Sequence, residues 1–450
     1  MVIKNRDELI NNGSIIFKKL REDTISSLEY LFEKIDPENK IKEILKKEDG
    51  KLKILDDEVN LNELKSIFLF AFGKGSIKMV KGVISKLDVY KGVVIGNVET
   101  NDLPQNIEYI KGDHPIPGEG SLLGGKKLIE LAKETEENDL SIVLISGGGS
   151  SLVEDPLIPL QDLKELTKIM LRYGLSIDEI NIIRKHLSNI KGGKFLNYLK
   201  GDVYSLIISD VIGDKIDTIA SGPTYFDNST FKDAYDILNR YRILNVVPKS
   251  VVEKIEKGLR GEIEETLKEK EFPKDRVKNY IILSNSITCE YLIEFFKNKG
   301  YSVFYLGSKI QGEVKEVTKI LGEIIIDIYE GKIDIKKPVA IIFGGETTVF
   351  VKGDGKGGRN QELTLLISKF IKDKKILFLS IGTDGIDGIT DAAGAICDGE
   401  TLNRVENLKL NIDEFLDNND SYNLFLKLND LIFTGPTGNN VMDIGISLIL

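Results

Sequence analysis

The sequence has 450 residues, of which 41% are hydrophobic and 29% are charged, and its formal net charge is −10. At roughly 150 residues per domain, this length predicts two or three domains, each large enough to bury a core. The net negative charge disfavours general binding to the phosphate backbone of nucleic acids. No apolar run approaches the roughly 18–20 residues of a membrane helix, and the N-terminus has no signal-peptide core, so we expect a cytoplasmic protein.

Histidine and cysteine are scarce, which limits the metal chemistry open to the chain. The only histidines are His114 and His186, so a three-histidine zinc site is impossible. Cys289 and Cys397 are far apart and share no metal-ligand spacing. Any bound metal is therefore expected to be a hard ion such as Mg²⁺, held by carboxylates.

The first half of the chain alternates between helical and strand patterns. Residues from about 5 to 65 are charged, with apolar residues at near-helical spacing, and are predicted to be helical. Helical periodicity returns at 122–136 and 162–173. Short apolar runs predict buried parallel strands, at 66–72, 92–95, 141–145 and 203–208. This alternation is typical of an α/β layer structure.

The pattern restarts after about residue 245. Predicted strands lie at 280–283, 303–306, 339–343 and 376–381, and predicted helices at 287–299, 312–330 and 361–372. A charged stretch at 257–278 is predicted to be a connecting or hinge segment. We therefore predict an α/β fold with two domains, residues 1–245 and 246–450, and a ligand bound between them.

Polar, glycine-rich loops follow three strands of the first half, where ligands bind in open α/β sheets. The segment Ser146-Gly-Gly-Gly-Ser-Ser151 is predicted to bind phosphate or carboxylate oxygens through its backbone N–H groups. Lys74, between two glycines, is placed to neutralise a phosphoryl group. Asp210 comes at the end of the strand at 203–208, as a catalytic base or metal ligand would. Asp214 follows it and either assists or closes a turn.

A basic segment lies between these loops, in an otherwise acidic protein. It contains Arg184, Lys185, Lys191 and Lys194. These side chains are predicted either to surround an anionic substrate or to form a solvated face. His186 is either a structural histidine, in the core or at a helix cap, or a functional one, and the sequence does not decide between the two.

The second half carries further glycine-rich and acidic loops. Gly353, Gly355 and Gly358 match GxGxxG, but no strand–helix–strand unit with a ribose-binding acid surrounds them. We therefore favour an anion-binding loop there, with Arg359 adding positive charge. Three aspartates on one turn system are predicted to orient a metal or a ligand hydroxyl: Asp384, Asp387 and Asp391.

Many of these segments, in this order, resemble the glycerate 2-kinase family, whose C-terminal region is the MOFRL domain. The resemblance runs from Gly73 to Asp443. Its most specific segments are His114-Pro-Ile-Pro117, Leu144–Ser151, Ile183–Ser188, Ser209–Asp214, Ala220–Thr224, Gly344–Thr348, Gly357–Glu362, Gly382–Gly385, Asn419–Tyr422 and Thr434–Gly438. One departure is Gly118, where the family usually has aspartate.

The resemblance implies ATP-dependent phosphorylation of D-glycerate at its 2-hydroxyl, with a divalent metal, taken as Mg²⁺. It implies a larger Rossmann-like N-terminal domain and a smaller C-terminal α/β domain, with the MOFRL region at about 338–445 and the active site in the cleft. The family's catalytic lysine and aspartate match Lys74 and Asp210. We assign the other site residues as phosphate- and nucleotide-binding (Ser146, Gly147, Gly148, Gly149, Ser150, Ser151, Glu346, Arg359 and Asn360), substrate-binding (Arg184 and Lys191) and metal-binding (Asp214 and Asp384).

Two alternatives stay open at this stage. One is an NAD(P)H-dependent hydroxypyruvate reductase, and the other is a non-catalytic protein that binds a sugar acid or a nucleotide. Neither nucleic acid nor a membrane is an expected partner, and a homodimer is compatible with the sequence.

Overall fold

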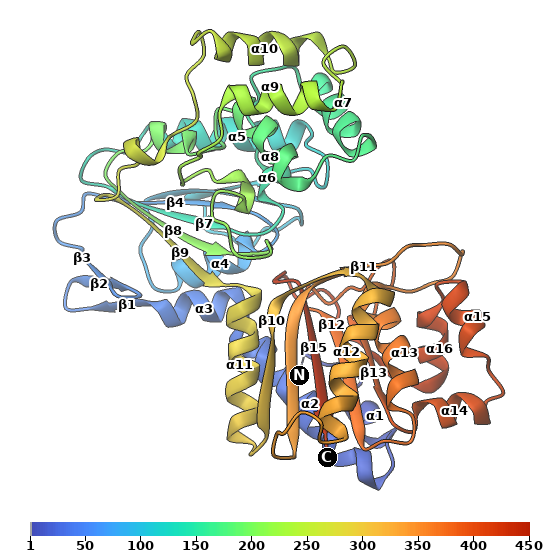
Figure 1. Ribbon diagram of the computed structural model, residues 1–450. Helices are drawn as coiled ribbons and strands as arrows, with labels where there is room; N and C mark the ends of the chain where they lie inside the picture. Colours follow the sequence, from blue (N-terminus) through green and yellow to red (C-terminus); the bar gives the residue numbers. More distant parts are fainter. Residues whose placement is uncertain (1) are drawn as a thin grey trace. The chain divides into compact units, whose positions relative to one another are not determined.

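The structure, a computed structural model, describes residues 2–450 and divides them into two compact units (Figure 1). One unit is Pro37–Ile282, called here the glycine-loop unit. The other, called the MOFRL unit, combines the residues up to Asp36 with Leu283–Leu450. Each has its own sheet and its own hydrophobic core. Within the described residues, no helix has both the length and the apolar character needed to cross a bilayer.

The sheet of the glycine-loop unit has six strands in the order β6-β5-β4-β7-β8-β9. Every pairing from β6 to β8 is parallel. The strand bounds are β4 Ile67–Phe72, β5 Lys91–Gly96, β6 Ile107–Lys111, β7 Leu140–Ile145, β8 Asp202–Ile208 and β9 Val277–Leu283. The central strands β4 and β7 are buried along their whole length, as expected for a parallel sheet covered on both faces.

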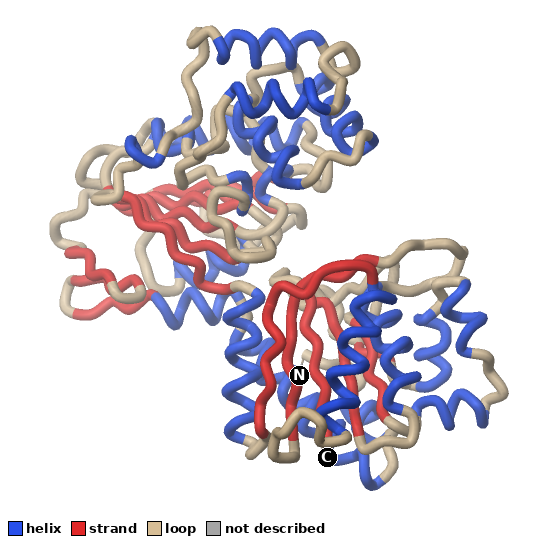
Figure 2. The backbone as a smooth tube through the Cα atoms, in the orientation of Figure 1, coloured by secondary structure: helices blue, strands red, loops and turns tan. Residues whose placement is uncertain are grey.

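Helices cover both faces of this sheet (Figures 1 and 2). Helix α4 packs against β4 and β5, and α5 packs against β5 and β6 on the other face. A further helical layer, α7 to α10, encloses a core of its own. The helix bounds are α3 Pro37–Ile44, α4 Ser76–Ile84, α5 Glu119–Ala132, α6 Gly149–Leu152, α7 Leu160–Arg172, α8 Ile177–His186, α9 Phe231–Arg240 and α10 Lys249–Leu259.

The MOFRL unit has a mixed six-stranded sheet in the order β10-β11-β15-β12-β13-β14. The pairing of β10 with β11 is parallel, and the other pairings are antiparallel. The strand bounds are β10 Ser302–Glu313, β11 Val339–Thr348, β12 Ile376–Gly382, β13 Gly394–Asp398, β14 Leu431–Ile432 and β15 Asp443–Ile449.

Helices α2 and α11 pack against one another and against strands of this sheet, while α12 and α13 pack together and also contact strands (Figure 1). The helix bounds are α1 Arg6–Asn11, α2 Ile15–Lys34, α11 Asn285–Asn298, α12 Val314–Tyr329, α13 Arg359–Ile371, α14 Thr401–Asn407, α15 Ile412–Asp417 and α16 Ser421–Leu428.

The units differ from the predicted division at residue 245. Helix α10, after that boundary, packs on α9 and α7 in the glycine-loop unit. Helix α2, at the other end of the chain, packs on α11, β12 and β15, because Leu20, Ile25 and Leu28 need an apolar partner and are fully buried there.

The helical prediction for residues 5–65 is wrong at its end. Residues 45–60 form a small antiparallel sheet of three strands, β1 Leu45–Glu48, β2 Lys51–Ile54 and β3 Asp57–Asn60. The two-residue alternation of buried and exposed positions in β2 identifies this segment as strand. The charge of the segment obscured that pattern.

A buried ion pair network attaches α2 to the MOFRL sheet. The Arg21 guanidinium is fully buried and lies 2.5 Å from Asp398 and 2.7 Å from Asp430. Arg404 is a second partner of Asp430, at 2.7 Å.

We expect Arg21→Met to lower the free energy of unfolding by about 3–5 kcal/mol, because two buried carboxylates lose their main cation. Urea unfolding followed by circular dichroism measures this loss. Arg6→Met is the control, since Arg6 is paired with Asp7 and Glu29 nearer the surface. An equal, small loss in both variants would contradict the role assigned to Arg21.

Candidate active site

Three loops of the glycine-loop unit meet at the carboxyl ends of adjacent strands. Lys74 follows β4, the glycine loop Ser146–Ser151 follows β7, and Asp210 follows β8. Since β7 lies between β4 and β8 and all three are parallel, the loops lie at one rim of the sheet. The structure thus brings together the two predicted catalytic residues and the predicted anion loop.

Hydrogen bonds fix the Lys74 loop to the glycine loop. The backbone N–H of Lys74 donates to the carbonyl of Gly147 at 2.9 Å. The N–H of Gly75 donates to the Ser146 hydroxyl, also at 2.9 Å. The Ser146 hydroxyl is buried, and the Ser146 backbone N–H is bonded to the carbonyl of Phe72 at 3.1 Å, so Ser146 helps to position the Lys74 loop. Lys74 itself is half-buried.

Asp210 lies directly against the glycine loop. A Cβ added to Gly147 would lie 2.2 Å from the Asp210 Oδ2 atom, so only glycine allows this approach. The Asp210 carboxylate accepts a hydrogen bond from the backbone N–H of Gly148. Burial raises the pKa of Asp210, while the Lys74 charge and the backbone hydrogen bonds oppose that rise. A carboxylate with a raised pKa is suited to accept a proton.

We expect Gly147→Ala to lower kcat by about 100-fold while leaving the protein folded. The added methyl group displaces the Asp210 carboxylate, and a displacement of about 1 Å at a reacting group has an effect of that size. Steady-state kinetics with circular dichroism measures both. Gly174→Ala is the control, because a Cβ there meets nothing within 4 Å, and its positive φ, which Gly147 does not share, makes it the more demanding substitution for the backbone. Equal activity losses would contradict the steric explanation.

His114 belongs to the same cluster, although we had assigned it no role in the site. A Cβ added to Gly148 would lie 3.1 Å from the His114 Cδ2 atom and 3.4 Å from the Lys74 Cε atom. Burial and the neighbouring Lys74 charge lower the pKa of His114, which keeps the imidazole neutral at neutral pH. Its place in the segment His114–Pro117 was the available signal.

The predicted substrate role of Lys191 is wrong, and that of Arg184 is reassigned. Lys191 is 1% exposed, and its Nζ atom lies 2.7 Å from Glu154 and 3.1 Å from the carbonyl of Val153. Arg184 donates to the carbonyl of Ser150 at 2.6 Å and to Glu154 at 3.3 Å. A buried cation must be paired, so these side chains support the glycine loop from within.

The remaining cations of the basic segment are also buried and bonded. Lys185 pairs with Asp217 at 3.2 Å and Asp227 at 3.3 Å, and Lys194 donates to the carbonyl of Ser188. His186 is a core residue that contacts Glu265 at 3.1 Å. The segment is therefore neither a solvated face nor an open cationic pocket.

In the MOFRL unit, Arg359 begins α13 beside two carboxylates. It lies 2.5 and 2.9 Å from the two Asp443 oxygens and 3.1 Å from Glu346. Asp443 is buried, whereas the side chains of Arg359 and Glu346 are 29% and 44% exposed. These last two residues remain accessible to a ligand.

Asn360 has a structural role instead of the predicted nucleotide-binding one. It is 1% exposed, accepts from the Ser380 hydroxyl at 2.6 Å and donates to Asp387 at 3.2 Å. Asp387 also accepts the backbone N–H groups of Asn360 and Gln361, which caps α13. Burial raises the pKa of Asp387 to about 6.

The first part of the GxGxxG loop uses its backbone N–H groups within the unit. The N–H groups of Lys352 and Gly353 donate to the Asn419 side chain, and that of Asp354 donates to Asn418. Those of Gly355 and Lys356 are bonded to the segment 418–420 as well. These donors are used within the unit, so the structure does not support the predicted anion-binding role for residues 352–356.

The two aspartates predicted to bind metal lie in different units. Asp214 is in the loop after Asp210, and Asp384 accepts the backbone N–H of Ile386. Asp391, from the same turn system as Asp384, accepts the Tyr422 hydroxyl at 2.7 Å. Across residues 2–450, no three histidine, cysteine or carboxylate side chains gather in a way that could hold a metal ion.

Comparison with known proteins assigns this arrangement to a family. The model described as a domain of unknown function (DUF4147) matches residues 25–256, and the MOFRL family model matches residues 339–443. A protein of Pyrococcus horikoshii named glycerate 2-kinase is 41% identical over 406 residues, covering 88% of this chain and 92% of its own length. The chain belongs to the glycerate 2-kinase family.

Solved structures agree with this family assignment. The crystal structure of a glycerate kinase from Thermotoga maritima is 35% identical, with a TM-score of 0.85 over 96% of this chain and all of that one. Another relative, from Agrobacterium vitis, is named a putative hydroxypyruvate reductase and is 34% identical over 390 residues, covering 84% of this chain and 97% of its own length. The likeness to the kinases thus extends over almost the whole chain and includes the fold.

Proposed function

We propose that this chain is a glycerate 2-kinase, which transfers the γ-phosphoryl group of ATP to the 2-hydroxyl of D-glycerate. The observation that carries the proposal is the meeting of Lys74, Asp210 and the glycine loop at one rim of the sheet. A cation, a half-buried carboxylate and a glycine-rich loop in direct contact with both are parts that suit phosphoryl transfer.

The chemistry assigns each part a role. The 2-oxygen of glycerate attacks the γ-phosphorus, the bond from that phosphorus to the β,γ-bridging oxygen breaks, and ADP leaves. Asp210 accepts the hydroxyl proton, and its raised pKa favours that transfer. Lys74 stabilises the charge on the phosphoryl oxygens, and its loop is held in place through Gly147 and Ser146.

The Mg²⁺ of a kinase is typically held by one or two carboxylates together with the substrate phosphates, so a site without three clustered ligand side chains is compatible with it. Asp214 is the residue of the glycine-loop unit that we assign to this role, because it lies four positions after Asp210. When bound, the ion neutralises charge on the nucleotide phosphates.

A reductase activity on hydroxypyruvate is less well supported. The backbone donors around Gly353 and Gly355 are taken by residues 418–420, so this part of the GxGxxG segment is not free to bind a dinucleotide pyrophosphate. The Lys74–Asp210 pair also matches phosphoryl transfer better than hydride transfer.

An assay of ADP release from ATP, Mg²⁺ and D-glycerate tests the proposal, with NADH and NADPH oxidation by hydroxypyruvate measured in parallel. We expect ADP release that depends on D-glycerate and no NADH or NADPH oxidation. NADH or NADPH oxidation by hydroxypyruvate, without ADP release that depends on D-glycerate, would favour the reductase over the kinase. Nucleotide binding without either turnover would favour the non-catalytic alternative.

A further inference from the structure

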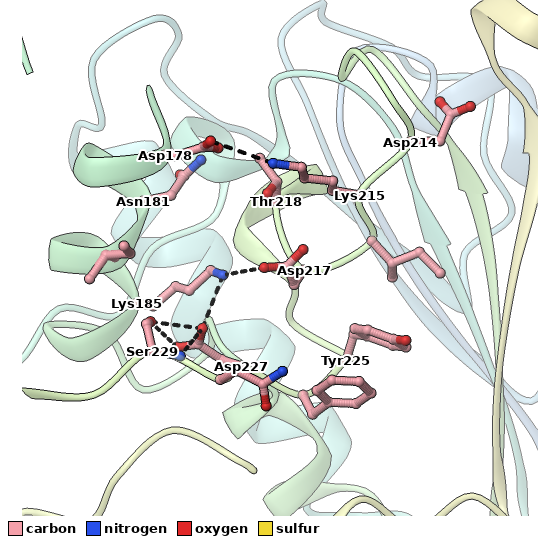
Figure 3. A pocket seen from close by; sticks show the side chains of 14 residues that line it. Asp178, Asn181, Lys185, Asp214, Lys215, Asp217, Thr218, Tyr225, Asp227 and Ser229 are labelled. Carbon is pink, nitrogen blue, oxygen red and sulfur yellow. Dashed lines mark hydrogen bonds and ion pairs between the residues drawn. The ribbon is translucent and has the colours of Figure 1, made fainter. Parts of the chain in front are cut away.

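A cavity of about 510 Å³ opens beside the loop that follows Asp210 (Figure 3). Its walls are α8 and the segment 214–229, both within the glycine-loop unit. Helix α8 begins at a fixed point, because the Ser176 hydroxyl and the Glu179 side chain form a capping box. Pockets of this size hold small molecules or cofactors, and of the residues that line this one the proposed chemistry uses only Asp214.

The cavity is linked to the glycine loop by two hydrogen bonds. The hydroxyls of Ser150 and Ser221 lie 2.8 Å apart, and Ser221 donates to Asn181 Oδ1 at 3.0 Å. Asn181 forms part of the cavity wall. The buried side chain of Ser221 thus bridges the glycine loop and the cavity wall, which places the two next to one another.

The charges that line the cavity disfavour an anionic group there. Four carboxylates line it, against two lysines. Both lysines are paired, Lys185 with Asp217 and Asp227, and Lys215 with Asp178 at 3.6 Å. Figure 3 shows Lys185 pointing toward its two partners. A triphosphate or the carboxylate of glycerate would meet net negative charge here.

The remaining features fit a nucleoside. Tyr225 and Phe226 both line the cavity, with ring centroids 4.2 Å apart, and each also contacts Phe272. Aromatic rings fixed in this way offer a stacking surface for a planar base. One oxygen of Asp217 accepts from Lys185, and its side chain is 41% exposed. Carboxylates of this kind accept hydrogen bonds from ribose hydroxyls.

We propose that this cavity holds the nucleoside of the phosphoryl donor, while the triphosphate extends to the glycine loop and Lys74. The inference rests on the proposed kinase function, and it adds which part of the chain recognises the nucleotide. Glycerate is the poorer occupant, because it is an anion and much smaller than the cavity. Tyr225 and Asp217 are then specificity-determining residues for the donor.

The test compares Tyr225→Ala with Tyr225→Phe, which keeps the ring, and with Tyr173→Ala, a tyrosine 42% exposed at the end of α7. The Kd for ADP is measured by isothermal titration calorimetry. We expect Tyr225→Ala to raise this Kd about tenfold, and the two other variants to stay within about twofold of the wild type. Circular dichroism confirms that each variant is folded.

Kinetics with two donors separates the possible occupants. With ATP, we expect Tyr225→Ala to raise the KM for ATP about tenfold and leave the KM for D-glycerate unchanged. With inorganic triphosphate, which lacks the nucleoside, the wild type and Tyr225→Ala should perform equally. A raised KM for D-glycerate with an unchanged Kd for ADP would assign the cavity to the acceptor and overturn the proposal.

The ADP titrations test this inference independently of the proposed function. If the wild type does not phosphorylate D-glycerate, the kinase assignment fails, yet the ADP titrations still decide whether Tyr225 contacts the nucleoside. If glycerate is phosphorylated but all three variants bind ADP as the wild type does, the nucleoside binds elsewhere and only this inference is overturned.

Discussion

Replacing Asp210 by asparagine is expected to lower kcat for D-glycerate phosphorylation by about 10²–10⁴-fold, the range associated with a general base. The amide keeps the shape of the carboxylate and cannot accept the hydroxyl proton. The KM for ATP should change little, because Asp210 is not assigned to nucleotide binding. Steady-state kinetics measures both parameters. Asp88→Asn is the matched control, since Asp88 in the same unit is fully exposed.

The pH dependence of the wild type gives a second readout of Asp210. The active form is the carboxylate, so kcat/KM should fall as the pH drops through the pKa of Asp210. Burial raises that pKa above its ordinary value of 3.8, which places the acid limb at a higher pH than an exposed aspartate would give. The limb should be absent from the residual activity of Asp210→Asn. A limb that persists there would assign the proton to another group.

Lys74→Ala is expected to lower kcat/KM for ATP by about 10²–10³-fold, because it removes the cation assigned to the transferring phosphoryl group. Lys81→Ala provides the control, since Lys81 lies on α4 and is paired with Asp102 near the surface. Single-turnover rates separate the chemical step from binding. A weaker ATP affinity with an unchanged single-turnover rate would show that Lys74 contributes to ATP binding but does not stabilise the transition state.

The same variant makes a prediction about Asp210. The Lys74 charge lowers the pKa of Asp210 and so opposes part of the effect of burial. Removing it raises that pKa further, and the acid limb of the residual activity should move to higher pH. An unmoved limb would mean that the two side chains do not interact in the active protein.

The strands that position the site were predictable because burial on both faces makes them short and continuously apolar. β4, β7 and β8 were found within one or two residues of their ends, and the parallel rule then placed Lys74, the glycine loop and Asp210 at one rim. The family resemblance added the reaction, and the comparisons agree with it.

The partners of charged residues could not be read from the sequence in the same way. Lys191 and Arg184 look like substrate ligands until their shared partner, Glu154, is known. Gly353 and Gly355 look like part of an anion loop until residues 418–420 are seen to bond the backbone of 353–356. In both cases the partner lies at least 30 residues away in the chain, and residue type and local spacing carry no information about it.

Phosphorus NMR of the product formed from D-glycerate, ATP and Mg²⁺ tests the central claim most directly. The account predicts 2-phosphoglycerate in the wild type and almost none in Lys74→Ala or Asp210→Asn. Appearance of 3-phosphoglycerate would keep the kinase class but contradict the placement of the 2-hydroxyl beside Asp210. Absence of any phosphorylated glycerate, with the protein folded and ATP bound, would contradict the account as a whole.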